Sequence, residues 1–369
     1  MKEGIELNTK KRIIGLDFAR ALAMFGMLLV NFMVITGAEG NGPPFLITFM
    51  SLFEGRASAL FVILAGIGIS LMTRSSVARN EKIKISNSRK IIWKRALFLF
   101  ILGLLLYVME WTGDILHYYG VYLFVAALLI TVRKKALLFL SIIILLLAQS
   151  LQLTFNAFEG WGGPTPFINY VDFWTVNGFL RNLFFNGYHP FFPWFSFFLI
   201  GMIIGRLDLH NKKIRDRFLL LGITFTILIE LLSKGLRLTY YFIPHIGKAA
   251  ATFLFNTGPI LPNILYILSA TGSAIAILIL CLYITEKYEN NWFVTSIIQT
   301  GQLTLTHYVS HVFIGIGALI LFNRMEHQTL LFVLLFATVF FIFSILFSVL
   351  WRKKFSRGPI EWIMRKLAS

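Results

Sequence analysis

Long apolar segments recur along the whole chain, separated by short polar connections. A helix needs about 20 predominantly apolar residues to cross the hydrocarbon core of a bilayer. Inside a bilayer the backbone must satisfy its own hydrogen bonds, so such segments form helices. The sequence therefore predicts an all-α fold, a polytopic membrane helical bundle of about ten transmembrane helices. The segments lie near Leu16–Ile35, Ser58–Met72, Ile91–Val108, Ile115–Val132, Ala136–Leu153, Pro190–Gly205, Phe218–Leu232, Ile264–Ile284, Leu303–Phe322 and Leu330–Trp351.

The composition excludes a soluble protein. Of the 369 residues 57% are hydrophobic and 38 are phenylalanine, and the mean hydropathy is +0.76. A soluble fold of this length could not bury so much apolar surface. The single cysteine, Cys281, lies within an apolar run, which rules out an intrachain disulfide.

The basic residues orient the predicted helices. The formal net charge is +17, from 34 Lys and Arg against 17 Asp and Glu. The basic residues gather in short connections, above all Thr73–Lys90 and residues 352–366, which is the positive-inside pattern and indicates no nucleic-acid partner. We expect the N-terminus and C-terminus inside and the long connections 155–189 and 234–262 outside. The outer connections carry only Arg181, Lys234, Arg237, Lys248 and Arg324.

The chain is predicted to be one integral membrane domain, residues 1–369, of a multi-pass cell-membrane protein. Residues 1–14 form a short cytoplasmic segment, and the first apolar run is too long, and lacks a cleavage site, to be a removed signal peptide. Residues 356–369 are expected to form an interfacial helix lying flat on the inner leaflet. Its lipid-facing side chains would be Ile360, Ile363, Met364 and Leu367.

The stretch Gly187–Arg206 combines a polar head with a tightly packing tail. Pro190 and Pro193 suit the first turn of a helix, because proline cannot donate a backbone hydrogen bond. That places His189 at the mouth of the predicted span. At the far end two glycines four residues apart allow a neighbouring helix to approach closely, and Arg206 should sit in water or headgroups.

Ionisable side chains within predicted spans are candidate functional residues, because they are costly to bury in a membrane. Asp17 and Arg20 lie on one face of the first span, with Asn31 further along it. A structural ion pair explains Asp17 and Arg20 as well as a direct role does. Glu54 and Arg56 stand where the chain re-enters the membrane from outside, and they either pair with each other or contact a substrate.

Histidines provide the candidate bases. Asp114 and His117 stand three residues apart at the start of a span, where the carboxylate could cap the helix, orient the imidazole, or do both. His189 should reach the same side of the membrane. His307 and His311 are four residues apart on one helix face. No glutamate follows the first of them and no third ligand is evident, so a polar seam is favoured and no metal is expected.

Several stretches resemble a known family. RIIGLDFARALAMFGMLLVN, LFEGRASALFVILAGIGIS, DILHYYGVY, GQLTLTHYVSH and GPIEWIMRK resemble the DUF418, YeiB-like group of bacterial membrane proteins. That group is similar to the transmembrane acyltransferase set, which includes heparan-α-glucosaminide N-acetyltransferase. The resemblance implies transfer of an acyl group, acetyl in the first instance, from cytoplasmic acyl-CoA to an extracytoplasmic acceptor such as a cell-envelope sugar. It also implies the bacterial plasma membrane as the location.

The resemblance extends to single residues. Asp17, Arg20 and Asn31 match a leading L-D-x-x-R…N pattern, and His311 matches a late Y-V-G-H motif. The family's catalytic histidine stands in an H-A-x-W-N-G setting, whereas the chain reads Met50–Gly55 there, without a histidine.

Three explanations remain open for that missing histidine. Glu54 takes its role, or His117 or His189 supplies the base from another helix, or the chemistry has been lost. We expect His189, His117, Glu54, Asp114 and Arg56 to converge in one outer-facing pocket.

For the donor we expect an inward-opening cavity lined by the first and ninth spans and reached past Arg20. The predicted partners are the lipid bilayer, acyl-CoA, a hydroxyl- or amine-bearing glycan or other acceptor and, with less support, a second copy in a homodimer. A secondary transporter with inverted repeats and a non-catalytic partner in envelope assembly are the alternative functions. The predicted donor-binding residues are Arg20, Asp17, Asn31, Arg56, His311 and His307.

Overall fold

The structure is a computed structural model that describes residues 12–162, 169–242 and 247–368. Most of the predicted N-terminal segment, residues 1–11, and the last residue therefore lie outside the described residues. The first half comprises α1 (Ile14–Ile35), α2 (Pro44–Ser51), α3 (Arg56–Ala78), α4 (Lys82–Val108), α5 (Leu116–Leu129), α6 (Lys134–Thr154), β1 (Trp161–Gly162), β2 (Asn169–Tyr170), α7 (Val176–Arg181) and η1 (Asn182–Asn186). The second half comprises α8 (Phe191–Ile204), α9 (Lys212–Arg237), η2 (Leu238–Tyr241), α10 (Lys248–Phe255), α11 (Ile264–Lys287), α12 (Trp292–Gly301), α13 (Thr304–Ser310), η3 (His311–Ile316), α14 (Gly317–Leu321), α15 (Leu330–Arg352) and α16 (Pro359–Ala368).

The all-α membrane bundle is confirmed, because each of the predicted spans falls on helical residues. Among the described residues, 8 helices are long and apolar enough to cross a membrane, or 9 if a bent pair counts as one span. That pair joins Val176–Asn186 to Phe191–Ile204 with a bend of 47°. The predicted span at residues 115–132 is the shorter apolar helix α5, whose 14 residues extend about 21 Å. It falls short of a bilayer core of about 30 Å.

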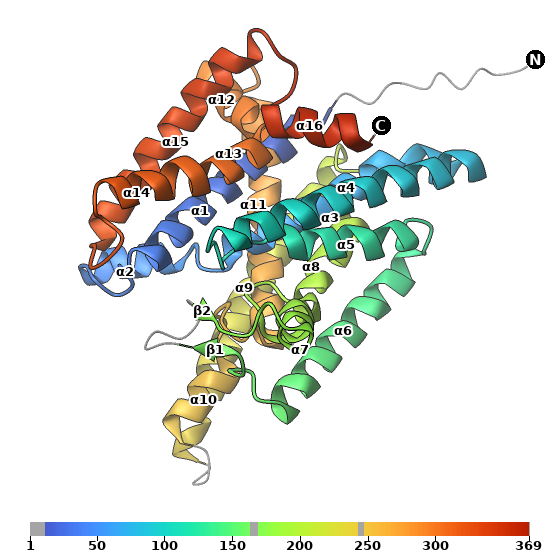
Figure 1. Ribbon diagram of the computed structural model, residues 1–369. Coiled ribbons are helices and arrows are strands. Elements are labelled where there is room, and N and C mark those ends of the chain that lie inside the picture. The colour runs from blue at the N-terminus through green and yellow to red at the C-terminus, as the bar shows by residue number, and fades with distance from the viewer. Residues whose placement is uncertain (1–11, 163–168, 243–246, 369) are drawn as a thin grey trace, which may run out of the picture.

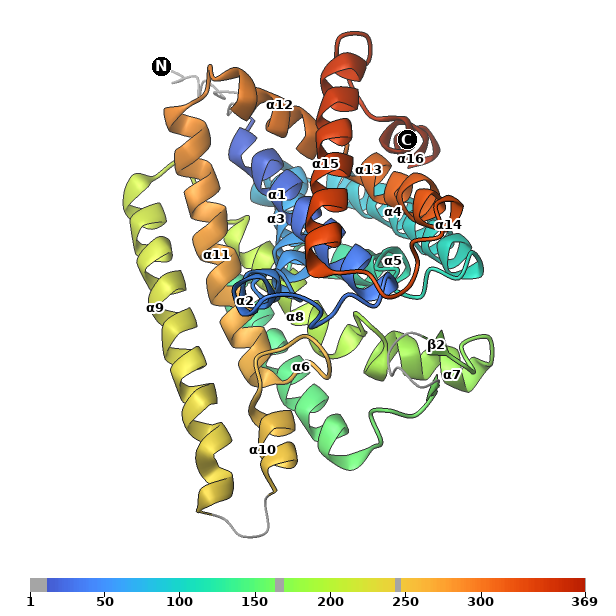
Figure 2. The same cartoon turned by 90° about the vertical axis from the view of Figure 1, so that its left-hand side faces the viewer.

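The two ends of the bundle differ. The start of α1 and the last helix, α16, lie at the same end, which we call the basic end (Figures 1 and 2). The short helix α10 lies at the opposite end. The described chain therefore begins and ends at the same end of the bundle, which an even number of crossings would produce. The assignment of the basic end to the cytoplasm stays a prediction.

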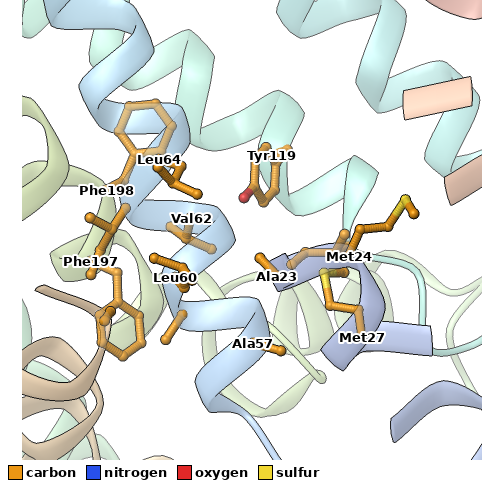
Figure 3. Packing of buried hydrophobic residues seen from close by; sticks show 14 of the residues in the cluster. Ala23, Met24, Met27, Ala57, Leu60, Val62, Leu64, Tyr119, Phe197 and Phe198 are labelled. Atoms are coloured by element: carbon orange, nitrogen blue, oxygen red, sulfur yellow. The ribbon is translucent and has the colours of Figure 1, made fainter. Parts of the chain in front are cut away.

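The centre of the bundle is packed by α1, α3, α5 and α8, whose buried side chains meet in Figure 3. The close approach predicted for the two glycines of the span at residues 190–205 is confirmed, and the neighbouring helix is α3. A Cβ added at Gly66 would collide with the carbonyl oxygen of Phe198, and one added at Gly201 with that of Ile63. Ser70 adds a hydrogen bond to the carbonyl of Met202 at 2.7 Å. The two backbones therefore approach more closely than any larger residue would allow.

The prolines act as predicted at the start of α8, which begins at Phe191 directly after Pro190. Phe192 departs from helical geometry, so the helix enters with a kink. Arg206, at the end of this helix and expected in water or headgroups, has specific partners. Its guanidinium is half-buried and donates to the carbonyls of Leu129, Ile130 and Val132 at the end of α5. A cation at a helix C-terminus satisfies carbonyls that lack intrahelical partners.

The long connection after α6 is structured. β1 and β2 form an antiparallel pair in which Trp161 faces Tyr170. Asn186, at the end of η1, accepts from the Tyr170 hydroxyl at 2.7 Å, and its carbonyl accepts from the Trp161 indole at 2.8 Å. The connection therefore holds in place the residues that lead into α8.

Candidate functional site

A cavity of about 880 Å³ opens among helix ends that the charge pattern predicts to face outside. Its wall is built from the end of α1, the start of α3, the connection between α4 and α5, and the break before α8. The connection before α11 and the segment η3 complete it. Both π-helices among the described residues, η1 and η3, border this cavity. Such helices are rare and often mark functional sites.

His189 lines this cavity from the break between η1 and α8. Its backbone carbonyl accepts from the Tyr122 hydroxyl at 2.5 Å, and its ring meets the Trp194 ring edge-on at 4.5 Å between centroids. Within the described residues, neither His189 Nδ1 nor Trp194 Nε1 has a hydrogen-bond partner, although both atoms are buried. Trp194 is 1% exposed and also lines the cavity. A buried polar atom without a hydrogen-bond partner is uncommon in a folded protein, so both residues are candidates for a functional role.

Asp114 and His117 form a fully buried pair one layer behind the cavity wall. Asp114 Oδ2 lies 2.8 Å from His117 Nδ1 and also accepts from the His117 backbone N–H at 3.0 Å. The carboxylate therefore accepts a backbone N–H from the first turn of α5 and also orients the imidazole. It makes both of the contacts that the spacing of Asp114 and His117 predicted. His117 Nε2 has no partner among the described residues. The Tyr118 ring packs against His117 at 3.9 Å and against His189 at 6.0 Å between centroids.

A buried hydrogen-bond chain connects this pair to the cavity. The Tyr308 hydroxyl donates to Asp114 Oδ1 at 3.3 Å and accepts from the Trp111 indole at 3.3 Å. His311 Nδ1 bonds the Tyr308 carbonyl, and its Nε2 lies 3.1 Å from Asn31 Nδ2. The amide of Asn31 donates, so Nδ1 carries the proton of a neutral His311. His311 thus orients Asn31, which lines the cavity.

The cavity wall is acidic although the chain is strongly basic. Its described lining includes Glu39, Glu54, Glu110 and Glu326 but no lysine or arginine. Burial raises the pKa of the Glu39 carboxyl, which lies in the connection after α1, and its charge reaches Glu54. The site therefore suits an uncharged or cationic ligand better than an anion.

The predicted five-residue pocket is only partly assembled. Glu54 and His189 line the cavity, and Asp114 and His117 lie directly behind it. Arg56 was placed wrongly. It pairs with Glu230 at 2.6 Å and donates to two serines of α11 at 3.0 and 3.1 Å. This arginine joins α3, α9 and α11, so its role is structural.

Asp17 and Arg20, two of the predicted donor-binding residues, do not line the cavity. Asp17 is 1% exposed and accepts from Arg20 at 2.7 Å, from Arg12 at 2.8 Å and from Gln302 at 3.4 Å. This cluster lies at the basic end and does not border the cavity, and its contacts are those of a structural ion pair. A direct role of Arg20 toward a donor stays a prediction.

His307 and His311 are both buried in the bundle but contact different helices. His307 Nε2 lies 2.7 Å from Ser348 Oγ of α15, whereas His311 contacts Asn31 of α1. The interpretation of this pair as a polar seam stays a prediction. In the described parts of the chain, no group of three or more His, Cys, Asp or Glu residues could hold a metal ion.

Sequence reasoning missed Trp111, Tyr308 and Trp194 as site residues. Trp111 and Tyr308 meet in a hydrogen bond although they are 197 positions apart in the chain. Nothing local in the sequence indicates that pairing. Trp194 beside His189 was visible in the sequence, but its unpaired indole nitrogen is a property of the packed structure.

Two family models match this chain, and two relatives align with nearly all of it. Residues 12–246 match the family model described as "Heparan-alpha-glucosaminide N-acetyltransferase, catalytic". Residues 206–369 match "Protein of unknown function (DUF418)". The chain is 23% identical to the "Uncharacterized protein YeiB" of Escherichia coli (strain K12), covering 97% of the chain and 96% of that protein. It is also 23% identical to an "Uncharacterized 39.9 kDa protein in amylase 3'region" of Bacillus acidopullulyticus, covering 97% and 94%.

Proposed function

Because the chain belongs to the heparan-alpha-glucosaminide N-acetyltransferase catalytic family, we propose that it is a membrane-embedded acyltransferase. It moves an acyl group, acetyl in the first instance, from cytoplasmic acyl-CoA to an acceptor on the far side of a bacterial plasma membrane. The observation that carries the proposal is the 880 Å³ cavity lined by His189, whose buried Nδ1 has no hydrogen-bond partner among the described residues.

In this proposal His189 is the general base. Its imidazole takes the proton from an acceptor hydroxyl or amine as that oxygen or nitrogen attacks the thioester carbonyl. A new C–O or C–N bond forms, the C–S bond breaks, and CoA leaves as the thiolate, which then takes a proton. The carbonyl oxygen becomes negative in the transition state, and the Trp194 indole N–H and the Asn31 amide are the donors on the wall that could stabilise it.

The buried Asp114–His117 pair has two candidate roles. It positions the wall through Tyr118, whose hydroxyl donates to Asn182 of η1 at 2.5 Å. Alternatively His117 is the base, after Tyr118 moves aside and exposes Nε2. We favour the positioning role, because His117 is 0% exposed whereas His189 lines the cavity.

The acceptor proposal follows from the charge of the wall. Four carboxylates and no basic residue line the described part of the cavity, which disfavours phosphorylated or carboxylated acceptors. Aromatic side chains from Trp111, Tyr188 and Trp194 supply faces against which a sugar ring packs. An uncharged or amine-bearing sugar of the cell envelope satisfies both requirements.

The assay is release of free CoA thiol by the purified protein in liposomes, with acetyl-CoA on one side and glucosamine or glucose on the other. We expect acetyl-CoA consumption that requires an acceptor and yields an equal amount of acetylated product. Acceptor movement across the membrane without acetylation would instead identify a transporter and contradict the proposal.

A further inference from the structure

The first turn of α13 has no local cap. Leu303 precedes the helix, and its apolar side chain makes no capping hydrogen bond. The first N–H groups of a helix lack partners within it, and a polar side chain just before the helix usually supplies one. Here the partner comes from the C-terminal helix α16, which packs on α13 at the basic end (Figure 1). It is Glu361, 56 positions after Leu305 in the chain.

Glu361 contacts this turn with both carboxylate oxygens. Oε1 accepts from the backbone N–H groups of Leu305 and Thr306 at 2.8 and 3.1 Å. Oε2 accepts from the Thr306 hydroxyl at 2.5 Å, and that hydroxyl accepts from the N–H of Ile360 at 3.2 Å. Gly358 leaves room for the carboxylate, since a Cβ there would come within 2.2 Å of Oε2. The start of α16 is therefore fitted onto the start of α13.

The turn that Glu361 caps leads directly into the cavity wall. Tyr308 lies on the same short helix, and its hydroxyl donates to Asp114 Oδ1 at 3.3 Å. His311 follows the last residue of that helix, and its Nε2 lies 3.1 Å from the amide nitrogen of Asn31, which lines the cavity. Because α13 has only 7 residues and a helix moves as a rigid unit, a displacement of its first turn reaches both side chains.

We propose that Glu361 is a positioning residue for the cavity. By capping α13 it holds Tyr308 and His311 in place, and through His311 it sets the position of Asn31. The C-terminal helix at the basic end of the bundle is thereby coupled to the wall of the cavity. Any effect of this coupling on catalysis rests on the proposed acyl transfer, whereas the coupling itself does not.

The test measures how fast a maleimide labels single cysteines in the cavity wall. It uses full-length protein in nanodiscs, in a Cys281→Ser background. The reporter is Val312→Cys, which follows His311 directly, lines the cavity and replaces a side chain that is 7% exposed. The reference is Ser58→Cys, which lies in the same wall but on α3. Each cysteine is combined with Glu361→Ala and with Glu361→Gln.

We expect Glu361→Ala to raise the labelling rate of Val312→Cys by about fivefold or more, the change in local opening typical of a lost helix cap. Ser58→Cys should keep its rate. Glu361→Gln retains an acceptor oxygen for both N–H groups, so both cysteines should label as they do beside Glu361. The control Leu367→Ala, at a position on α16 that is 62% exposed, should change neither rate.

A milder variant covers the case in which Glu361→Ala does not fold. Thr306→Val loses only the hydroxyl contact and keeps both backbone N–H groups bonded to Glu361. It should raise the rate at Val312→Cys by a smaller factor and leave Ser58→Cys unchanged.

Equal labelling of Val312→Cys beside Glu361→Ala and beside Leu367→Ala would refute the positioning role. An equal rise at Ser58→Cys would refute it too, because it would indicate general loosening of the protein. In the acetyl-transfer assay, Glu361→Ala should lower kcat by about 10- to 100-fold, the cost of a misplaced wall, and Glu361→Gln should retain it. The expected labelling in a protein that transfers no acetyl group would support the positioning role and contradict only the proposed function.

Discussion

Asp114 joins His117 to Tyr308 behind the cavity wall. Its two oxygens bond the ring and backbone of His117 and the hydroxyl of Tyr308, all without solvent contact. Such a buried network specifies one arrangement only when every member is satisfied. The exception within this network is Nε2 of His117, which has no partner among the described residues.

At the same scale, the contacts of Arg56 predict a stability effect without a catalytic one. Arg56→Ala leaves Glu230 without its cation between α3, α9 and α11. Because the two side chains are 18% and 30% exposed, solvent screens the loss, and we expect about 1–3 kcal/mol of destabilisation. Thermal unfolding of Arg56→Ala, Glu230→Ala and the double variant gives the coupling. Additive effects, or loss of transfer in folded Arg56→Ala, would contradict the structural role.

The acidic wall predicts a dependence of acceptor binding on charge and pH. Burial raises the pKa of Glu39 above 4.5, so this carboxyl takes up a proton at a higher pH than an ordinary glutamate. Binding of cationic glucosamine should therefore weaken as the pH falls through that raised pKa, whereas binding of uncharged glucose should not. Glu39→Gln should raise the KM for glucosamine, remove its pH dependence and leave glucose unaffected.

The control for Glu39 is Glu289→Gln, an exposed position between α11 and α12. It removes the same charge far from the cavity. An equal change of KM for both sugars, or an equal effect of the two substitutions, would show that the wall does not select by charge.

Among the elements, the contact of α3 with α8 positions His189, because α8 begins two residues after it. Gly201→Ala places a methyl against the carbonyl oxygen of Ile63. We expect destabilisation of about 1–3 kcal/mol, since neither backbone can move without repacking. The matched control is Gly235→Ala in α9, where an added Cβ meets nothing within 4 Å. There alanine should be neutral or stabilising. Equal melting temperatures of the two variants would exclude a close-packed seam.

Hydrophobic segments sufficed to predict the helices, because the membrane dictates helical backbone wherever apolar residues run long. The i, i+3 spacing of Asp114 and His117 likewise predicted their contact. The π-helix that begins at His311 was not predictable from any local pattern. The pairing of Arg56 with Glu230 spans 174 positions. It depends on which helices become neighbours, and one sequence does not encode that in any local pattern.

For the molecule as a whole, the basic end is predicted to face the cytoplasm and the acidic cavity the exterior. In a Cys281→Ser background, a cysteine at Glu326 borders the cavity and one at Lys354 lies at the basic end. In intact cells an impermeant maleimide should label Glu326→Cys and reach Lys354→Cys only after permeabilisation. The opposite pattern would reverse the orientation and with it the side from which the acyl donor approaches.

In the proposed mechanism, acyl transfer in the cavity depends on His189. The decisive measurement is the rate of acetyl transfer from acetyl-CoA to glucosamine by purified His189→Ala in liposomes. Its control is His210→Ala, an exposed histidine in the connection before α9. We predict that His189→Ala lowers the rate by about 10²–10⁴-fold, the loss typical of a removed general base, and that His210→Ala retains full activity. Full transfer by folded His189→Ala would contradict the account.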